Sequence, residues 1–312
     1  MDLKEQLFKE LAKKGYSKRK TGEKVWDVAN RSLLYATPEL ADSFLKFRNH
    51  ERYKKIVVDR EISLLKDVFK EVGNELMSEP INLIDMGCGD GLKAKEFLKL
   101  FRGGKIRYCP VSVSDNLIEL AEANVRSGKF AHVVEYHSKN ACLESLGEVA
   151  SELRNGEFKR NIILLLGSIL SSFEIHEYLF NLTQGMLSGD LLIVGNGVRK
   201  GERFMNIETY KHPYFEEWLF LLIKELGFSK NEVEYGARFE NGRAEGFYTL
   251  KVNKIVERAG EKIKFSKGDE IVVAYLYKYF EKELKKYFGM YFREIEMFKD
   301  DEGEIAVGIC RK

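Results

Sequence analysis

Cysteine is scarce in this chain of 312 residues, and its placement argues against several kinds of site. The chain has four cysteines: Cys88, Cys109, Cys142 and Cys310. None of them forms a C-x-x-C pair, so we expect neither a disulfide framework nor a cysteine-based metal site. His132, His137 and His176 also lack the spacing of metal ligands, and we interpret them as structural or exposed. We therefore expect no metal centre.

Long apolar runs are also missing. No run reaches the roughly 18 residues that a membrane-spanning helix needs. The first residues, Met-Asp-Leu-Lys-Glu-Gln, are charged and lack the apolar segment of a signal peptide. Glutamine occurs only at Gln6 and Gln184, whereas charged residues make up 32% of the chain, a bias typical of thermophilic proteins. We expect a cytoplasmic protein from a thermophile, with no membrane partner.

The net charge of +2 gives no global reason to expect a nucleic-acid partner. One local basic run covers residues 13–24, and its simplest interpretation is a solvated helix end and loop. The alternative is that this run contacts phosphates together with Arg199, Lys200 and Arg203. A nucleic-acid partner is thus an open alternative, but not the favoured one.

Strands and helices alternate along much of the chain. Apolar segments predict strands at 81–86, 107–113, 133–136, 161–166 and 190–195, with helices at 92–101, 117–127, 143–154 and 176–187. This rhythm is typical of a parallel, doubly wound sheet. After a helix at 280–288, strands at 292–298 and 304–311 are expected to add an antiparallel terminal hairpin. The prediction is an α/β fold with a Rossmann-like, mostly parallel seven-stranded sheet.

The rhythm breaks after residue 199. A helix at 215–226 precedes strand-like sequence, in which Asn241-Gly242 is the signal of a type I′ hairpin, and a further strand is expected at 271–276. Residues 1–60 are expected to be mostly helical. We predict a cofactor domain from 61–199 and 280–312, and a smaller α+β substrate or lid domain from 1–60 and 200–279.

The most informative stretch is 83–91, Leu-Ile-Asp-Met-Gly-Cys-Gly-Asp-Gly. Glycines at 87, 89 and 91 follow an apolar strand and precede a helix, so the turn can be tight and a ligand can lie against bare backbone. The G-x-G-x-G spacing, with Asp85 just before it, differs from the G-x-G-x-x-G of dinucleotide binders. It looks like motif I of S-adenosylmethionine (SAM)-dependent methyltransferases. Within it, Cys88 is expected to be a small filler and not a nucleophile.

Further segments, in order from Tyr53 to the C-terminus, resemble the histidine-specific SAM-dependent methyltransferases. The best-known members of this family trimethylate the α-amine of histidine on the way to ergothioneine. The matching segments are 53–62, 83–93, 107–114, 164–173, 189–194 and 268–279. The resemblance implies the family's fold, SAM as cofactor and methyl transfer as the activity.

The resemblance also implies a set of cofactor-binding residues. In this sequence they are Asp85, Gly87, Cys88, Gly89, Lys93, Ser112, Asn140, Gly167 and Ser168. Ser112 stands where the family has an acid at the end of the second strand, and Asn140 stands where it has an acid beside the adenine. Asp85, Lys93 and Asp115 are therefore expected to contribute more of the affinity, and an amide oxygen at Asn140 can still accept from an adenine amino group.

For the acceptor, the resemblance implies substrate contacts from Tyr53, Ser172, Tyr275 and Tyr277. The family's glutamate and serine that hold histidine fall at Ala274 and Leu276. A site built on polar contacts discriminates steeply on them. We therefore expect a small amine or amino-acid-like acceptor other than histidine, and no catalytic residue is assigned.

Two alternatives remain open from the sequence. One is a methyltransferase acting on a macromolecule, either tRNA or protein. The other is a non-catalytic protein that binds SAM but has lost the acceptor site.

Overall fold

The computed structural model describes residues 2–201, 207–258 and 260–312. The chain divides into two compact units, one made of Met1–Arg48 and Phe204–Tyr277, the other of Asn49–Arg203 and Lys278–Lys312. We call them the inserted unit and the sheet unit. The sequence suggested changes of domain at 60–61, 199–200 and 279–280. The first of these differs most, because the helical segment after residue 48 belongs to the sheet unit.

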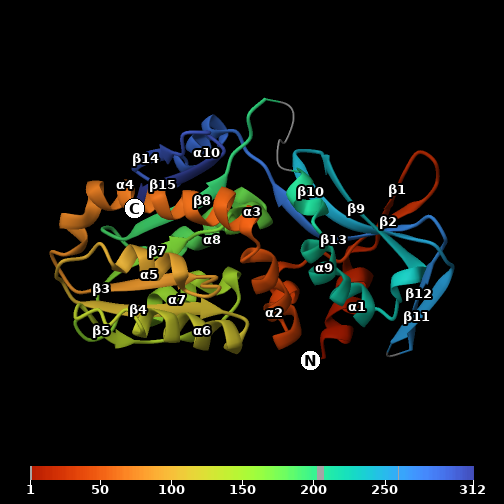
Figure 1. Cartoon of the computed structure of the whole chain (residues 1–312), viewed down its shortest axis with the longest axis horizontal. Helices are drawn as coiled ribbons and strands as arrows, with labels where there is room; N and C mark the ends of the chain where they lie inside the picture. The colour runs from red at the N-terminus through yellow and green to blue at the C-terminus, as the bar shows by residue number, and fades with distance from the viewer. Residues whose placement is uncertain (1, 202–206, 259) are drawn as a thin grey trace. The chain divides into compact units, whose positions relative to one another are not determined.

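The sheet unit is built on a twisted, mostly parallel sheet with the strand order β14-β15-β8-β7-β3-β4-β5 (Figure 1). Its strands are β3 (Ile81–Met86), β4 (Ile106–Ser112), β5 (Val133–Tyr136), β7 (Arg160–Leu165), β8 (Leu191–Gly197), β14 (Glu294–Lys299) and β15 (Ile305–Arg311). A two-residue strand, β6 (Lys139–Asn140), also pairs with β4. Only β15 runs antiparallel to both neighbours in this order. The predicted Rossmann-like sheet with an antiparallel terminal hairpin is confirmed.

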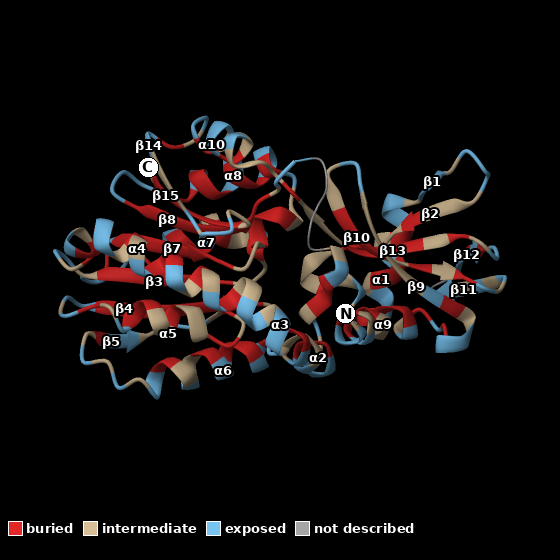
Figure 2. Ribbon diagram, turned by 45° about the horizontal axis from the view of Figure 1, so that its top comes forward, coloured by how far each residue is buried: buried red, intermediate tan, exposed pale blue. Residues whose placement is uncertain are grey.

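Helices cover both faces of this sheet, as a doubly wound fold requires. They are α4 (Asp59–Leu76), α5 (Leu92–Leu98), α6 (Asp115–Arg126), α7 (Leu146–Glu152), α8 (Ile175–Gln184) and α10 (Glu281–Phe288). Alternate residues of β3 enter different cores: Leu83 packs with α4 and α5, whereas Ile84 packs with α7, α8 and α10. The central strands are therefore buried on both faces, which Figure 2 shows as red ribbons.

The inserted unit has its own five-stranded sheet, in the order β1-β2-β13-β10-β9. The strands are β1 (Tyr16–Lys18), β2 (Lys24–Asp27), β9 (Val233–Glu240), β10 (Arg243–Leu250) and β13 (Glu270–Tyr277), and the helices that complete it are α1 (Leu3–Lys14), α2 (Pro38–Arg48) and α9 (Pro213–Glu225). β9 and β10 are joined by Asn241 and Gly242, whose φ angles of 52° and 75° confirm the predicted type I′ hairpin.

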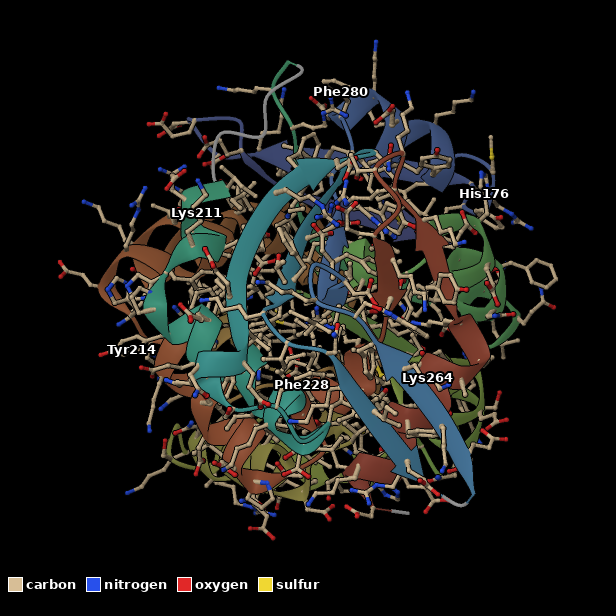
Figure 3. All side chains as sticks on the ribbon, turned by 90° about the vertical axis from the view of Figure 1, so that its right-hand side faces the viewer. His176, Lys211, Tyr214, Phe228, Lys264 and Phe280 are labelled. Atoms are coloured by element: carbon tan, nitrogen blue, oxygen red, sulfur yellow. The ribbon has the colours of Figure 1, made fainter. Side chains whose placement is uncertain are left out.

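The sequence predicted that the basic run at 13–24 is a helix end followed by a loop, and the structure differs. The run forms the end of α1 and the antiparallel hairpin of β1 and β2, in which Lys18 stands opposite Lys24. A separate hairpin, β11 (Lys254–Arg258) with β12 (Glu261–Phe265), carries Phe265. Its ring packs edge-on against the buried Phe228, which is labelled in Figure 3.

The packing of α7 on α8 depends on a contact between two glycines. A Cβ atom added at Gly185 would overlap the backbone of Gly147, so neither helix can move closer and a side chain would force them apart. Among the described helices, none is long and apolar enough to cross a membrane.

We expect Gly185→Ala to lower the free energy of unfolding by about 1–3 kcal/mol, the usual cost of overpacking against backbone that cannot yield. Gly103→Ala is the matched control, because a Cβ there meets nothing within 4 Å. Urea unfolding followed by circular dichroism measures both. Equal midpoints for the two variants would contradict the proposed tight contact.

Candidate functional site

Most of the site residues predicted from the sequence lie at one edge of the sheet unit. Asp85, Ser112 and the Gly167-Ser168 pair stand at or just beyond the carboxyl ends of β3, β4 and β7. These strands are neighbours, with β3 paired to β4 on one side and to β7 on the other. In open α/β sheets, ligands bind outside the carboxyl ends of the strands. The sheet thus brings residues from distant parts of the sequence to one candidate site.

The three glycines of the loop after β3 have two different roles. All have positive φ angles, 69° at Gly87, 56° at Gly89 and 71° at Gly91. A Cβ at Gly87 would overlap the side chain of Ile169, and one at Gly91 would lie 2.8 Å from the backbone of Ala121 in α6. A Cβ at Gly89, in contrast, would meet nothing within 4 Å. The outer glycines therefore allow close packing, and the middle one borders open space.

The loop is attached to the neighbouring strand. The backbone amides of Gly87 and Cys88 both donate to the carbonyl of Val111 in β4, at 2.9 and 3.2 Å. In the two strands that precede this edge, the hydroxyl of Tyr108 in β4 donates to the buried carboxylate of Asp85 in β3 at 2.8 Å. Burial, with a further contribution from Asp85, raises the pKa of Tyr108 well above its usual value, so the phenol stays protonated and keeps donating.

Cys88 contributes packing to this loop. Its side chain is buried against Ile118 and Ala121 of α6, and its sulfur lies 3.9 Å from the carbonyl oxygen of Leu117. Burial raises the pKa of the Cys88 thiol well above its usual value, and the charge of Asp85 adds to the effect. A protonated, buried thiol is inert, in agreement with the prediction that it fills space.

Lys93, in the first turn of α5, is paired with a residue that the sequence analysis did not assign to the site. Its ammonium group contacts the carboxylate of Glu61, in α4, and Glu61 is only 1% exposed. The same carboxylate accepts from the backbone amide of Gly167 at 2.8 and 3.1 Å. One buried carboxylate therefore joins α4, α5 and the end of β7.

Gly167 and Ser168 form a turn with two successive positive φ angles, 81° and 59°. A positive φ angle is unusual for a residue with a side chain. At Ser168 two hydrogen bonds stabilise it: the Ser168 amide donates to the carbonyl of Gly195, and its hydroxyl accepts from the amide of Gly197 at 2.9 Å. Non-glycine residues in this region are uncommon and often accompany functional sites. The hydroxyl keeps a proton that can be donated to a ligand.

At the same edge of the sheet, Ser112, the last residue of β4, pairs with Asn140 in β6. The Ser112 hydroxyl accepts from the amide of Ser114 at 3.1 Å. The side-chain amide of Asn140 donates to Asp115, the first residue of α6, at 2.6 Å, and both side chains are exposed. This bond uses the side-chain nitrogen of Asn140, so the side-chain oxygen of Asn140 and the Asp115 carboxylate can still accept hydrogen bonds.

Two of the predicted substrate residues also belong to the sheet unit. Ser172 ends the short helix η4 (Ile169–Ser172), which packs Ile169 against the glycine loop. Tyr53 ends α3 (Glu51–Tyr53), and a π-helical turn at Lys54–Val58 separates it from α4. Such π-turns are frequent at functional sites.

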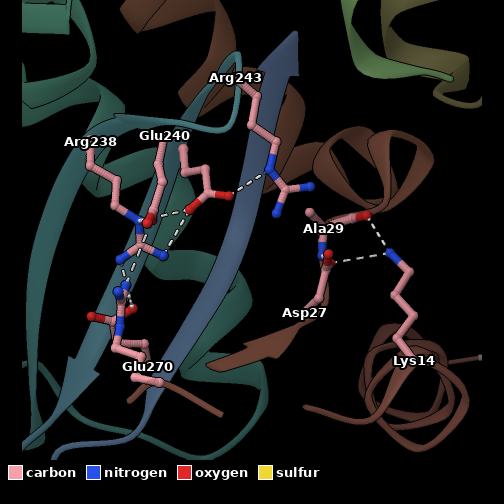
Figure 4. Close-up of polar contacts among 9 residues, drawn as sticks. Lys14, Asp27, Ala29, Arg238, Glu240, Arg243 and Glu270 are labelled. Carbon is pink, nitrogen blue, oxygen red and sulfur yellow. Dashed lines mark hydrogen bonds and ion pairs between the residues drawn. The ribbon is translucent and has the colours of Figure 1, made fainter. Parts of the chain in front are cut away.

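The other two predicted substrate residues, Tyr275 and Tyr277, lie on β13 in the inserted unit. Tyr275 stands opposite the buried Glu245, and the guanidinium of Arg243 lies 4.6 Å from its ring centre. Glu245 accepts from both Arg243 and Arg238, part of the ion-pair network drawn in Figure 4. Burial raises the pKa of Tyr275 to about 12, so it is a hydrogen-bond donor at neutral pH and not a base.

Glu61 is the site residue that sequence reasoning missed, although a signal for it existed. The buried residues of α4 recur at helical spacing, and they are Glu61, Leu64, Leu65, Val68, Gly73, Val72 and Leu76. A glutamate on the apolar face of a helix is expensive to bury without a partner. That position therefore indicates a cation or another hydrogen-bond donor near the first turn of α4, although it does not say which residue supplies it.

Comparison with known proteins bears on this site. A family model described as histidine-specific, SAM-dependent methyltransferase matches residues 44–312. No curated protein matches the chain.

Solved structures give weaker likenesses. A SAM-dependent methyltransferase from Clostridium acetobutylicum has 12% identity and a TM-score of 0.46, with 86% of this chain and 98% of that chain covered. The magnesium protoporphyrin IX methyltransferase from Synechocystis, with bound S-adenosylhomocysteine, has 11% identity and a TM-score of 0.47, with 90% and 98% covered. A sugar N-methyltransferase from Streptoalloteichus has 12% identity and a TM-score of 0.41, with 87% and 92% covered. The fold rests on the strand order described above.

The open space beside Gly89 makes a direct prediction. Gly89→Asn should weaken binding of S-adenosylhomocysteine at least about tenfold, because the added side chain enters the space where a ligand would lie against the loop. Asparagine is chosen because it tolerates a positive φ angle better than other side chains. Isothermal titration calorimetry measures the affinity.

Gly156→Asn is the matched control for this variant. Gly156 is exposed, has a φ angle of 55°, and a Cβ there also meets nothing within 4 Å, so the backbone cost is the same. Its affinity should equal that of the wild type. Equal affinity in both variants would remove the glycine loop from the ligand site.

Proposed function

Because the chain belongs to the histidine-specific, SAM-dependent methyltransferase family, we propose that it transfers a methyl group to a small amine or amino-acid-like acceptor other than histidine. The observation that carries the choice of acceptor is the apolar character of β13 at Ala274 and Leu276.

The residues at the carboxyl edge of the sheet unit fit the cofactor. Gly89 offers bare backbone, Lys93 offers a cation for a carboxylate, and Ser168 offers a hydroxyl. The full proposed set is Asp85, Gly87, Cys88, Gly89, Lys93, Ser112, Asn140, Gly167 and Ser168. Cys88 takes part through its backbone, since its side chain is buried against α6.

SAM, when bound, supplies a methyl group that is already activated by its sulfonium. The chain then has two tasks, to align the acceptor with that methyl and to exclude water. Neither task requires an acid–base pair when the acceptor arrives neutral, and no catalytic residue is assigned here. Tyr53, Ser172, Tyr275 and Tyr277 are the proposed acceptor contacts.

The acceptor side is apolar where histidine recognition would need polar groups. Ala274 pairs with Gly246 across β10, and Leu276 pairs with Ala244. A Cβ at Gly246 would lie 2.7 Å from Leu219 of α9, so the face of β13 that carries Ala274 is lined by apolar atoms. An imidazole placed against such a surface would leave its nitrogens without partners, at a cost of about 1–3 kcal/mol for each buried group. This supports an acceptor other than histidine.

A macromolecular acceptor has less support. In the basic run, Lys14 is bound by Asp27 and by the carbonyl of Ala29, and Arg19 is bound by Glu270 (Figure 4). Two of its cations are thus neutralised within the inserted unit. Arg203, which the sequence added to this basic set, lies outside the described residues.

We expect SAM with a radiolabelled methyl group to label a small primary or secondary amine or an amino acid, but not histidine. The wild-type protein is incubated with separate pools of amines, amino acids, histidine and bulk RNA, and products are separated by chromatography. Label in RNA alone would reject the small-molecule acceptor. No label in any pool, with S-adenosylhomocysteine still bound, would favour a non-catalytic SAM-binding protein.

Tyr275 stays protonated at neutral pH and is not a base, so the pH dependence of the reaction should be set by the acceptor. Only the neutral amine attacks, so kcat/KM should rise about tenfold per pH unit below the acceptor's own pKa and become constant above it. Steady-state rates with two acceptors of different pKa measure this. A profile that bends at the same pH for both acceptors would point to a base in the protein.

A further inference from the structure

We propose that Glu61 is a positioning residue, which holds Lys93 in place for the amino-acid carboxylate of the cofactor. The inference rests on the proposed function, since it takes Lys93 as the contact for that carboxylate. It assigns a role to a buried charge that the reaction itself does not use.

The partners of Glu61 occupy the cofactor edge. Its carboxylate contacts the Lys93 ammonium and accepts from the Gly167 amide, and its side chain is almost fully buried. Lys93 follows the glycine loop directly, on the first turn of α5, and Gly167 begins the turn that carries Ser168. The Glu61 carboxylate therefore holds both the first turn of α5, which follows the glycine loop, and the turn after β7.

The chain leaves space for the Glu61–Lys93 ion pair by means of two glycines. A Cβ at Gly195, in β8, would overlap the Glu61 carboxylate itself. A Cβ at Gly167 would lie 3.1 Å from the Lys93 ammonium. The backbone of β8 and that of the turn after β7 thus approach the ion pair closely, and alanine at position 195 would displace it.

The charge of Glu61 determines what Lys93 can do. A lysine side chain has four rotatable bonds and a strongly hydrated ammonium, so a lone Lys93 would gain rotamer freedom by swinging into water. Glu61 fixes the ammonium and uses one of its three N–H donors, which leaves donors for a ligand carboxylate. The pair is also neutral, which suits an amino-acid group that itself carries both charges better than a simple anion.

The test compares two probes that differ in the amino-acid group. S-adenosylhomocysteine has it, and 5′-methylthioadenosine lacks it. Glu61→Gln places an NH₂ donor against either the Gly167 amide or the Lys93 ammonium, so it disturbs the pair with almost no change of volume. We expect it to weaken the binding of S-adenosylhomocysteine at least about tenfold, which is the effect of losing one charge-assisted hydrogen bond. The binding of 5′-methylthioadenosine should weaken less than about twofold.

Two further variants separate positioning from loss of stability. Gly195→Ala should reproduce the same split between the probes, because its methyl group displaces the Glu61 carboxylate. Gly308→Ala is the control: its Cβ would crowd Met297 and Val194 in the core on the other face of the sheet, away from α4 and Glu61, so it should leave the ratio of the two affinities unchanged. Thermal unfolding of each variant records the stability cost separately.

A double-mutant cycle completes the test. In a Lys93→Met background, Glu61→Gln should change S-adenosylhomocysteine affinity less than about twofold, since the residue through which it acts is gone. Equal weakening of both probes, or no weakening of S-adenosylhomocysteine, would overturn the proposal. A wild-type protein that fails to bind S-adenosylhomocysteine would instead overturn the proposed function.

Discussion

A buried charge must be paired, and in this protein that constraint organises the carboxyl edge of the parallel sheet. Glu61 lies on the apolar face of α4 among leucines and valines, and it is tolerated only because Lys93 and the Gly167 amide meet it there. The pairing fixes how α4, α5 and the turn after β7 sit relative to one another. Gly195 is then required to be glycine, although nothing about its own strand conformation demands it.

The glycine loop shows the same division between support and open space. Gly87 and Gly91 let Ile169 and α6 pack against the loop, and Val111 holds it from the neighbouring strand. Gly89 alone faces free space. A loop that is packed on both flanks and bare at its centre can present backbone to a ligand without having to reorganise, which lowers the entropy cost of binding.

Much of this was predictable from the sequence, because the parallel strands are continuous apolar runs bounded by glycine. The strand expected at 81–86 and that expected at 133–136 match β3 and β5 at both ends. The hairpin of β1 and β2 was not predicted, since all residues of Tyr16–Lys18 are exposed and give no alternating pattern. Glu61 was missed for another reason: its partner Gly167 is 106 residues away, and only the fold brings them together.

The path of the chain through the inserted unit has a consequence for folding during synthesis. β2 pairs in parallel with β13, and the indole of Trp26 reaches Asp269, 243 residues further along the chain. Residues 1–48 leave the ribosome long before β13, which is the central strand of the sheet to which they belong. Contacts between residues that are so far apart in the sequence form slowly. Lys18, on the edge strand β1, stands opposite Lys24 of β2, and such charges on an edge strand disfavour pairing with a strand of another molecule before β13 arrives.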